Sequence, residues 1–388
     1  MDRLAREATA RVMRPTAASP LPGRLLVFFT RGMSLKMWQQ AGLLERELAL
    51  YRAMRPRLSG LAFLTYGGME ERLFDGRLDG IRLLPNRWRL RSNLYSVVAP
   101  LLHARAMRQA TVFKTNQLNG AWSAAIAKRL FRKKLIVRCG YIWSDFYARL
   151  DHPAWKVRLA RRLERWVVRQ ADRLIVATDA DRRRLVSLHR VDADKVAIIP
   201  NYIDTKRFRP MPEVEKAPGL ICFIGRLEAQ KNPLALLEAI KGMPNVRLAI
   251  VGEGSLRSML ERRAREWQLP VEWLGIVPHE RLPELLNRAQ LFILPSHFEG
   301  HPKALLEAMA CGLPVIGARS PGVQELLVHR ETGYLCGTSA AEIRAAVAAV
   351  LEDAVLARHM AEQARVSVET ACSLDTVAQE ELALLADL

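Results

Sequence analysis

Short apolar runs alternate along the whole chain with longer segments in which apolar residues recur every three to four positions. Runs of four to six apolar residues are typical of strands buried on both faces, and the longer spacing is typical of helices packed on a sheet. The first half of the chain is predicted to hold seven strands, at residues 25–30, 61–66, 81–85, 111–116, 135–139, 174–178 and 196–200. The second half is predicted to hold six, at residues 220–224, 246–251, 271–274, 291–294, 315–318 and 334–336.

This alternation predicts an α/β fold made of two doubly wound, Rossmann-like domains. A segment rich in proline and charged residues, 201–219, is typical of a link between domains. We therefore expect an N-terminal domain at residues 1–205 and a C-terminal domain at residues 206–371. Ligand is expected in the interdomain cleft, at the carboxyl ends of the strands.

The stretch from Pro295 to Val315 carries the most chemical information. It places Glu299 in a loop after a strand, and it places Glu307 in the second turn of a helix that begins near Pro302. The free backbone N–H groups at residues 300–303 provide a site for an anion at the start of that helix. Two carboxylates beside an anion site suit a ligand with many hydroxyls and a phosphate, and a nucleotide sugar is such a ligand.

Two glycine turns follow earlier strands of the second half. Gly225 is followed by Arg226 and Lys231, five residues apart, whose cations can neutralise a diphosphate from two sides. Gly252 and Glu253 belong to a second close-approach turn that opens a helix. Taken alone, the two cations fit a pair of solvated surface side chains better than a diphosphate site.

Two blocks resemble signatures of the retaining glycosyltransferases of family four (group 1). They are E-G-x-P-x-x-x-L-E-A-M-A-C-G-L-P-V, which starts at Glu299, and G-R-L-x-x-x-K-N, which starts at Gly225. The resemblance implies the GT-B fold, with an acceptor-binding N-terminal domain, a C-terminal domain that binds a nucleotide sugar, and a last helix, about 372–388, that crosses back to the first domain. It implies transfer of the sugar to a hydroxyl with retention of anomeric configuration, without a metal or other cofactor.

The resemblance also implies a role for each motif residue. Glu299 would contact hydroxyls of the donor sugar and Glu307 the ribose, while Arg226 and Lys231 would contact the pyrophosphate. Glu299, Arg226 and Lys231 are the expected catalytic residues. The expected donor site consists of Gly225, Arg226, Lys231, Gly252, Glu253, Glu299, Gly300, His301, Pro302, Lys303, Leu306 and Glu307.

The first half carries weaker signals for the acceptor. Gly32 and Ser34 fit a glycine-bearing loop that relatives bring close to the transferred sugar. After the fifth predicted strand, where many relatives carry a histidine, this chain reads Arg138-Cys-Gly-Tyr-Ile-Trp-Ser-Asp. Tyr141 or Asp145 is the candidate polar contact there, and a core tyrosine and an N-capping aspartate are the alternatives.

The net charge of +19 is unevenly distributed. Residues 1–210 carry 42 Lys and Arg against 17 Asp and Glu, whereas residues 211–388 carry 17 against 23. We expect the basic half to face a glycan or lipid-linked anionic acceptor, such as a lipid-linked diphosphate or a lipopolysaccharide core, and to contact an anionic membrane. The amphipathic helix expected at 153–170 either docks on that membrane or packs its apolar face in the core.

Composition narrows the setting further. No apolar run reaches the roughly 18–20 residues of a membrane span, and the five cysteines are scattered without a C-x-x-C pair. We expect a cytoplasmic protein at the inner face of the membrane that works in the synthesis of cell-surface polysaccharide or lipopolysaccharide.

Three other interpretations of the sequence are weaker. His297, Glu299 and His301 invite a metal site, but their spacing fits no familiar ligand pattern. A phosphorylase or a sugar-nucleotide epimerase shares the expected fold. A nucleic-acid-binding protein would explain the positive charge, but the chain lacks the interleaved aromatic motif of such proteins.

Overall fold

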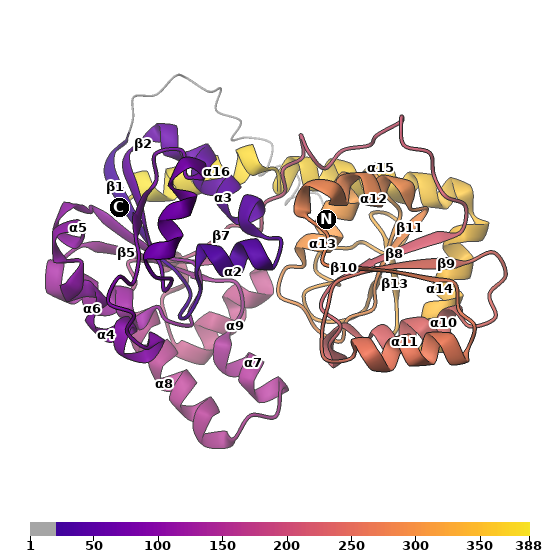
Figure 1. The fold of residues 1–388 in the computed structure, drawn as a ribbon, viewed down its shortest axis with the longest axis horizontal. Helices are drawn as coiled ribbons and strands as arrows, with labels where there is room; N and C mark the ends of the chain where they lie inside the picture. Colours follow the sequence, from indigo (N-terminus) through magenta and orange to yellow (C-terminus); the bar gives the residue numbers. More distant parts are fainter. Residues whose placement is uncertain (1–20) are drawn as a thin grey trace.

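The computed structural model describes residues 21–388. Two α/β domains lie side by side, each built on a parallel sheet covered by helices (Figure 1). The strand order is β3-β2-β1-β4-β5-β6-β7 in the N-terminal domain and β10-β9-β8-β11-β12-β13 in the C-terminal domain. The expected fold of two doubly wound domains is confirmed. The start of the expected first domain, residues 1–20, lies outside the described residues.

All thirteen predicted strands are present, with ends shifted by a few residues. The N-terminal sheet contains β1 Leu21–Phe28, β2 Leu58–Leu64, β3 Arg82–Leu84, β4 Val112–Thr115, β5 Lys134–Cys139, β6 Arg173–Val176 and β7 Val196–Ile198. The C-terminal sheet contains β8 Leu220–Ile224, β9 Arg247–Val251, β10 Val271–Gly275, β11 Leu291–Leu294, β12 Val315–Ala318 and β13 Tyr334–Cys336. The central strands are continuous apolar runs because helices cover both of their faces.

Helices follow most of the strands. The N-terminal domain has α2 Leu35–Gln40, α3 Leu44–Met54, α4 Ser92–Leu102, α5 Ala104–Gln109, α6 Trp122–Phe131, α7 Trp143–Arg149, α8 Ala154–Gln170 and α9 Asp179–His189. The remaining helices are α10 Pro233–Ile240, α11 Arg257–Glu266, α12 Leu282–Arg288, α13 Lys303–Ala310, α14 Ala340–Glu352, α15 Ala354–Ala371 and α16 Leu374–Ala386. None of the described helices combines the length and the apolar character that crossing a membrane requires.

Strand β1 shows how one run supplies two core layers. Leu26 and Phe28 belong to a core layer shared with residues of α4 and α6, whereas Leu25 and Val27 belong to the layer on the opposite face, shared with residues of α2 and α3. Successive side chains of a strand point to opposite faces, so a fully apolar run is needed to fill both layers. This arrangement leaves the loops at the carboxyl ends of the strands to build the site.

The chain ends on the domain in which it began. Helix α16, yellow in Figure 1, packs against α3 of the N-terminal domain. The crossing is fixed by two backbone bonds, Ile203 N to Cys372 O at 2.7 Å and Leu374 N to Ile203 O at 2.8 Å. Linker and last helix therefore cross between the domains side by side.

A candidate active site between the two domains

Lys231 and Glu299 meet where the neighbouring strands β8 and β11 end. Lys231 Nζ lies 2.6 Å from Glu299 Oε1, and the two side chains are 16% and 8% exposed. Their loops are tied together, because His297 N donates to Gln230 O at 2.9 Å and Gln230 Nε2 donates to Phe298 O at 2.8 Å. The structure thus brings into contact an acid and a base that the sequence places in different motifs.

Arg226 belongs to the same loop but is exposed. Burial raises the pKa of Tyr141, in the N-terminal domain, and the charge of Arg226 acts against this shift. The guanidinium of Arg226 therefore lies within electrostatic range of the Tyr141 hydroxyl, across the gap between the domains. It is free to turn toward an anion in that gap.

The glycine turns after β8 and β9 pack backbone against backbone. A methyl group on Gly252, whose φ is +129°, would lie 2.0 Å from the carbonyl oxygen of Gly225. Leu227 N donates to Glu253 O at 3.0 Å, while the Glu253 carboxylate pairs with Arg257 Nη1 at 3.1 Å. This close approach requires glycine at position 252, whereas a methyl group on Gly225 would meet only side-chain atoms, the nearest at 3.3 Å. The exposed Glu253 side chain is engaged by its own helix.

The expected anion site lies at the start of α13. Within residues 21–388, the N–H groups of Gly300 and His301 donate to no protein acceptor. Pro302 is the N-cap residue of α13, and Leu306 N donates to Pro302 O at 3.3 Å. The helix N-terminus therefore presents free donors beside Glu299.

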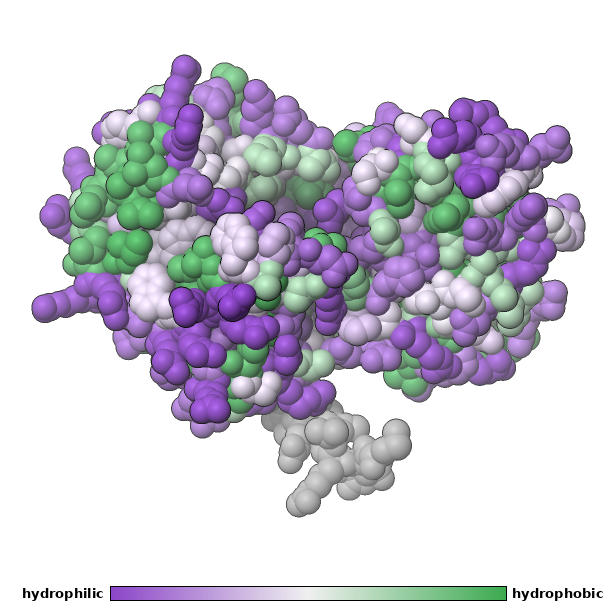
Figure 2. Space-filling view, turned by 90° about the horizontal axis from the view of Figure 1, so that it is seen from below, coloured by the Kyte–Doolittle hydropathy of each residue, from purple (hydrophilic) through white to green (hydrophobic). Residues whose placement is uncertain are grey.

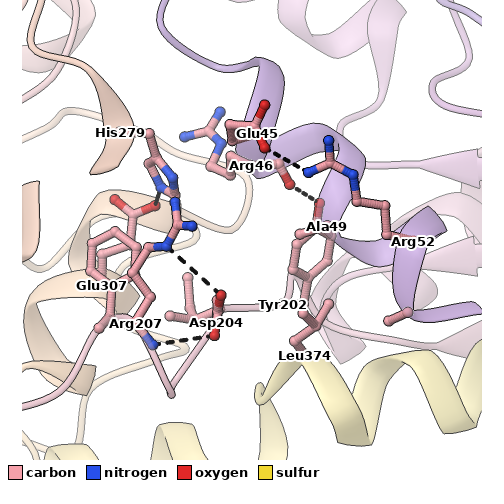
Figure 3. A pocket seen from close by; sticks show the side chains of 13 residues that line it. Glu45, Arg46, Ala49, Arg52, Tyr202, Asp204, Arg207, His279, Glu307 and Leu374 are labelled. Carbon is pink, nitrogen blue, oxygen red and sulfur yellow. Dashed lines mark hydrogen bonds and ion pairs between the residues drawn. The ribbon is translucent and has the colours of Figure 1, made fainter. Parts of the chain in front are cut away.

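Glu307 lines a cavity that Glu299 does not line. Its Oε1 lies 2.8 Å from Nε2 of His279, and both side chains are buried. The two residues line a cavity of about 300 Å³ between the domains, in which α3, the linker and α13 meet (Figure 3). Lys231, Glu299 and Arg226 do not line this cavity. Glu307 of α13 thus lines this cavity, whereas Glu299, in the loop before α13, pairs with Lys231 outside it.

Arg138 lies at the end of β5, just before the segment in which many relatives carry a histidine, and its side chain binds the start of the linker between the domains. Its Nη2 donates to Pro200 O and to Asn201 Oδ1, both at 3.1 Å. Asn201 Nδ2 in turn donates to His301 O at 2.7 Å. Arg138 and Asn201 therefore position the loop between β11 and α13, residues 295–302, which we call the donor loop because the sequence predicts donor contacts there. Sequence reasoning missed this role because Arg138, Asn201 and His301 are far apart in the chain.

The environment of His301 fixes its charge. Burial is the main cause that lowers the pKa of His301 to about 4, and the charges of Arg138 and Lys303 add to it. The imidazole is therefore neutral at pH 7. On the other side of the same loop, a methyl group on Gly300 would lie 2.6 Å from Gly140 O, so the two domains approach each other there backbone to backbone.

Lys303 was expected in the donor site, and its ammonium bridges the domains. Its Nζ lies 3.0 Å from Glu47 Oε1 of α3 and 4.6 Å from the ring centre of Tyr202. Arg46 Nε lies 3.2 Å from the same carboxylate oxygen. Burial by itself raises the pKa of Glu47, but the nearby Lys303 and Arg46 outweigh it and hold that pKa at about 2.

This cluster predicts acid sensitivity. Unfolding releases Glu47 to its ordinary pKa of 4.5, so between about pH 4.5 and pH 2 the unfolded chain binds more protons and stability falls. The stabilisation is fully present above pH 4.5, and we expect about 2 kcal/mol of it, because the cost of burying Lys303 offsets part of the gain. Urea unfolding at pH 7 and pH 3 should show a smaller acid loss in Glu47→Gln than in the parent chain; an equal loss would contradict the assignment.

The expected acceptor residues differ in how they are placed. Gly32 has φ +83°, in the loop after β1, and Ser34 caps α2 by accepting from Met37 N at 3.1 Å. Asp145 binds Arg184 of α9 through both carboxylate oxygens, at 2.7 and 2.8 Å. It lies in the first turn of α7, whose N-cap residue is Ile142, so the capping alternative is wrong. Tyr141 remains the candidate that faces the gap.

Aromatic groups meet beside this tyrosine. Tyr141 and Phe146 lie 5.3 Å apart between ring centres, and Phe146 meets Phe298 of the donor loop edge-on at 6.3 Å. The guanidinium of Arg149 lies 5.0 Å from the Phe298 ring centre. No group of three or more His, Cys, Asp or Glu side chains in the described part of the chain is arranged to hold a metal ion.

Two family models match the chain. One, described as "Glycosyl transferases group 1", matches residues 204–367, and the other, "Glycosyltransferase Family 4", matches residues 61–207. Glycogen synthase of Mycobacterium tuberculosis (strain CDC 1551 / Oshkosh) is 30% identical over 236 residues, which cover 57% of this chain and 55% of that protein. D-inositol 3-phosphate glycosyltransferase of Mycobacterium leprae (strain Br4923) is 32% identical over 187 residues, 44% of each. The chain thus spans about half the length of the curated relatives that it matches.

Solved structures show a similar fold over nearly the whole chain. HepE from Anabaena in complex with UDP and glucose superposes with a TM-score of 0.77 at 18% identity, covering 94% of this chain and 100% of that one. The same protein has been solved with UDP-glucose, and this structure gives a TM-score of 0.76 at 19% identity. Together with the family matches, which run from residue 61 to residue 367, the two parallel-sheet domains show that this chain belongs to the group 1 glycosyltransferases of family four and has the GT-B fold.

Proposed function

We propose that this protein transfers a sugar from a nucleoside diphosphate sugar to a hydroxyl of a glycan or lipid-linked acceptor, with retention of anomeric configuration. One observation carries the proposal. The Lys231–Glu299 pair lies beside the free N–H groups that open α13, at the carboxyl ends of β8 and β11. Cation, carboxylate and anion site together suit the phosphates and the hydroxyls of one ligand.

Each group has a place in the proposed reaction. Lys231 and Arg226 would neutralise the diphosphate as it departs, helped by the positive end of α13, which supplies the electrostatic stabilisation without a metal. Glu299 would orient sugar hydroxyls, and the departing phosphate oxygen would take the proton of the attacking acceptor hydroxyl on the same face of the sugar. Glu307 would hold the ribose about 6 Å along the helix from Lys303, a distance that four residues of helical rise provide.

A thermal-shift screen of nucleotide sugars tests this proposal. UDP-glucose is the first compound to examine, because it is bound in a solved structure of the same fold. A ligand present at 100 times its Kd should add about 2.7 kcal/mol to the stability of the folded chain. A screen of uridine, guanosine and adenosine diphosphate sugars in which none raises the unfolding temperature would contradict the proposal.

The acceptor is proposed to be anionic and membrane-bound, in cell-surface polysaccharide or lipopolysaccharide synthesis at the inner face of the membrane. Helices α7 and α8 project from the N-terminal domain, and the view from below shows mainly hydrophilic surface there with apolar patches between (Figures 1 and 2). On α8, Trp155 is 61% and Leu159 is 49% exposed, whereas Val167 is buried. The first half of α8 therefore leaves two large apolar side chains exposed, whereas the second half packs apolar side chains in the core.

Outward-facing apolar side chains among cations support docking on anionic lipid. Each cation near the membrane surface would contribute about 1 kcal/mol of binding free energy. The contact would be peripheral, through α7 and α8. Failure of the protein to sediment with anionic vesicles at physiological salt would contradict it.

A further inference from the structure

A basic pocket lies between α8 and α9. It has a volume of about 500 Å³, and four arginines contribute to its lining, together with the buried His189. The arginines are Arg165 and Arg169 of α8, Arg184 of α9, and Arg190, which follows α9. No step of the proposed sugar transfer uses these residues.

The pocket is separate from the interdomain cavity, because the two have no lining residue in common. Helix α8 ends shortly before β6 begins, and α9 begins shortly after β6 ends, so the last turns of both helices lie toward the amino end of the sheet. Lys231 and Glu299 follow the carboxyl ends of β8 and β11 in the other domain, and neither lines the pocket. A ligand in the pocket would therefore not compete with a donor in the gap.

The positive charge in the pocket is only partly neutralised. Arg184 is paired with Asp145, at 2.7 Å between Nε and Oδ2. For Arg165, Arg169 and Arg190, no carboxylate of residues 21–388 lies within ion-pair distance. Gathering like charges without a counter-charge is unfavourable, and it is relieved when an anion binds.

His189 supplies a second, independent observation. It is fully buried, and neither ring nitrogen has a hydrogen-bond partner among the described residues. The nearest carboxylate, Glu164, lies 3.4 Å from Nε2 and accepts instead from Ser144 N at 2.8 Å and Ser144 Oγ at 2.5 Å. Nε2 thus lies within ion-pair distance of Glu164, and Nδ1 is the ring nitrogen without a polar partner among the described residues. A buried polar atom without a partner is costly, and a ligand oxygen that reached Nδ1 would remove that cost.

We propose that this pocket is a second anion site, which binds a phosphate or diphosphate group. Several guanidinium groups around one pocket match the multiple charges and oxygens of a phosphate or diphosphate better than the single charge of a carboxylate or chloride. The group would belong either to a soluble phosphorylated compound or to the headgroup of a lipid. The site goes beyond the proposed sugar transfer and does not depend on it.

The test compares two double variants with the same change in charge on the same helix. R165Q/R169Q removes two cations of the pocket, and R158Q/R162Q removes two exposed cations one to two turns away. Glutamine keeps the helix propensity of arginine, so both variants should fold, which circular dichroism checks. The probes are inorganic pyrophosphate, by titration calorimetry, and vesicles of phosphatidylcholine with and without phosphatidylglycerol, by co-sedimentation.

We expect R165Q/R169Q to bind pyrophosphate at least tenfold more weakly than R158Q/R162Q, which should stay within twofold of the parent chain. If the two variants differ only in their affinity for pyrophosphate, the ligand is a soluble phosphate compound. If R165Q/R169Q also co-sediments with anionic vesicles less than R158Q/R162Q does, the ligand is a lipid headgroup. If the two variants have the same affinity for pyrophosphate and the same co-sedimentation with vesicles, the proposed site is wrong, because the diffuse positive charge of the helix would then explain the binding. Titration of UDP-glucose into the same proteins reports the donor site separately.

Discussion

Replacing Lys231 or Glu299 by alanine is expected to lower the rate of sugar transfer by about a thousandfold, equivalent to about 4 kcal/mol of transition-state stabilisation. Lys231 supplies a full positive charge where the diphosphate would leave, and Glu299 is its direct partner at 2.6 Å. Both side chains lie at loop ends and not inside the core, so the fold should survive. The measurement is release of nucleoside diphosphate from the donor found in the thermal-shift screen.

A matched control separates chemistry from charge. Glu362→Ala removes an exposed carboxylate of the same domain, on α15, and should keep the parental rate. Thermal unfolding of all three variants should lie within a few degrees of the parent chain. If Lys231→Ala and Glu299→Ala release nucleoside diphosphate at the parental rate, the assignment of these two residues to the active site is wrong.

Glu381→Ala is expected to lower the free energy of unfolding by about 3–5 kcal/mol. The Glu381 carboxylate of α16 contacts the ammonium of Lys114 in β4 and lies 3.1 Å from Arg138 Nη1 in β5. Lys114 and Glu381 are each 2% exposed, and burial lowers the pKa of Lys114 while Glu381 acts against the shift. Truncation would leave a buried ammonium without its counter-charge, and urea unfolding at pH 7 measures the loss.

The neighbouring residue provides the control. Glu380 lies on the same helix but is exposed, and Glu380→Ala should change stability by less than about 0.5 kcal/mol. The double variant Lys114→Met/Glu381→Leu should recover much of the loss, because an apolar pair can replace a buried ion pair. A Glu381→Ala chain as stable as the parent would show that the pair contributes nothing to folding.

Much of the architecture was decided locally, within short windows of sequence. Strands such as β11 and β12 are uninterrupted apolar runs because both faces of a covered sheet must be filled, so their positions follow from a few consecutive residues. Gly252 marks a close-approach turn for a comparable reason, since only glycine leaves room there for the backbone of Gly225. The motifs likewise placed Lys231 and Glu299 at the ends of their strands.

The network behind the donor loop was decided only by how the two domains and the last helix pack. Arg138 binds Asn201 and Glu381, and Asn201 binds His301. Each pair joins separate elements, so no fixed number of residues between the partners could reveal it in the sequence. The same holds for Lys303, which the motif assigned to the donor but which pairs with Glu47 of the other domain.

By itself, the sequence of this protein determined its strands, its glycine turns and the motif residues of the donor side, because each is encoded by neighbours along the chain. The tertiary structure alone decided which charges meet across the domains, that Glu307 lines a cavity that Glu299 does not, and which side of α8 is exposed. The physical reason is that ion pairs and burial depend on distance in space, which residue spacing fixes only inside a single element.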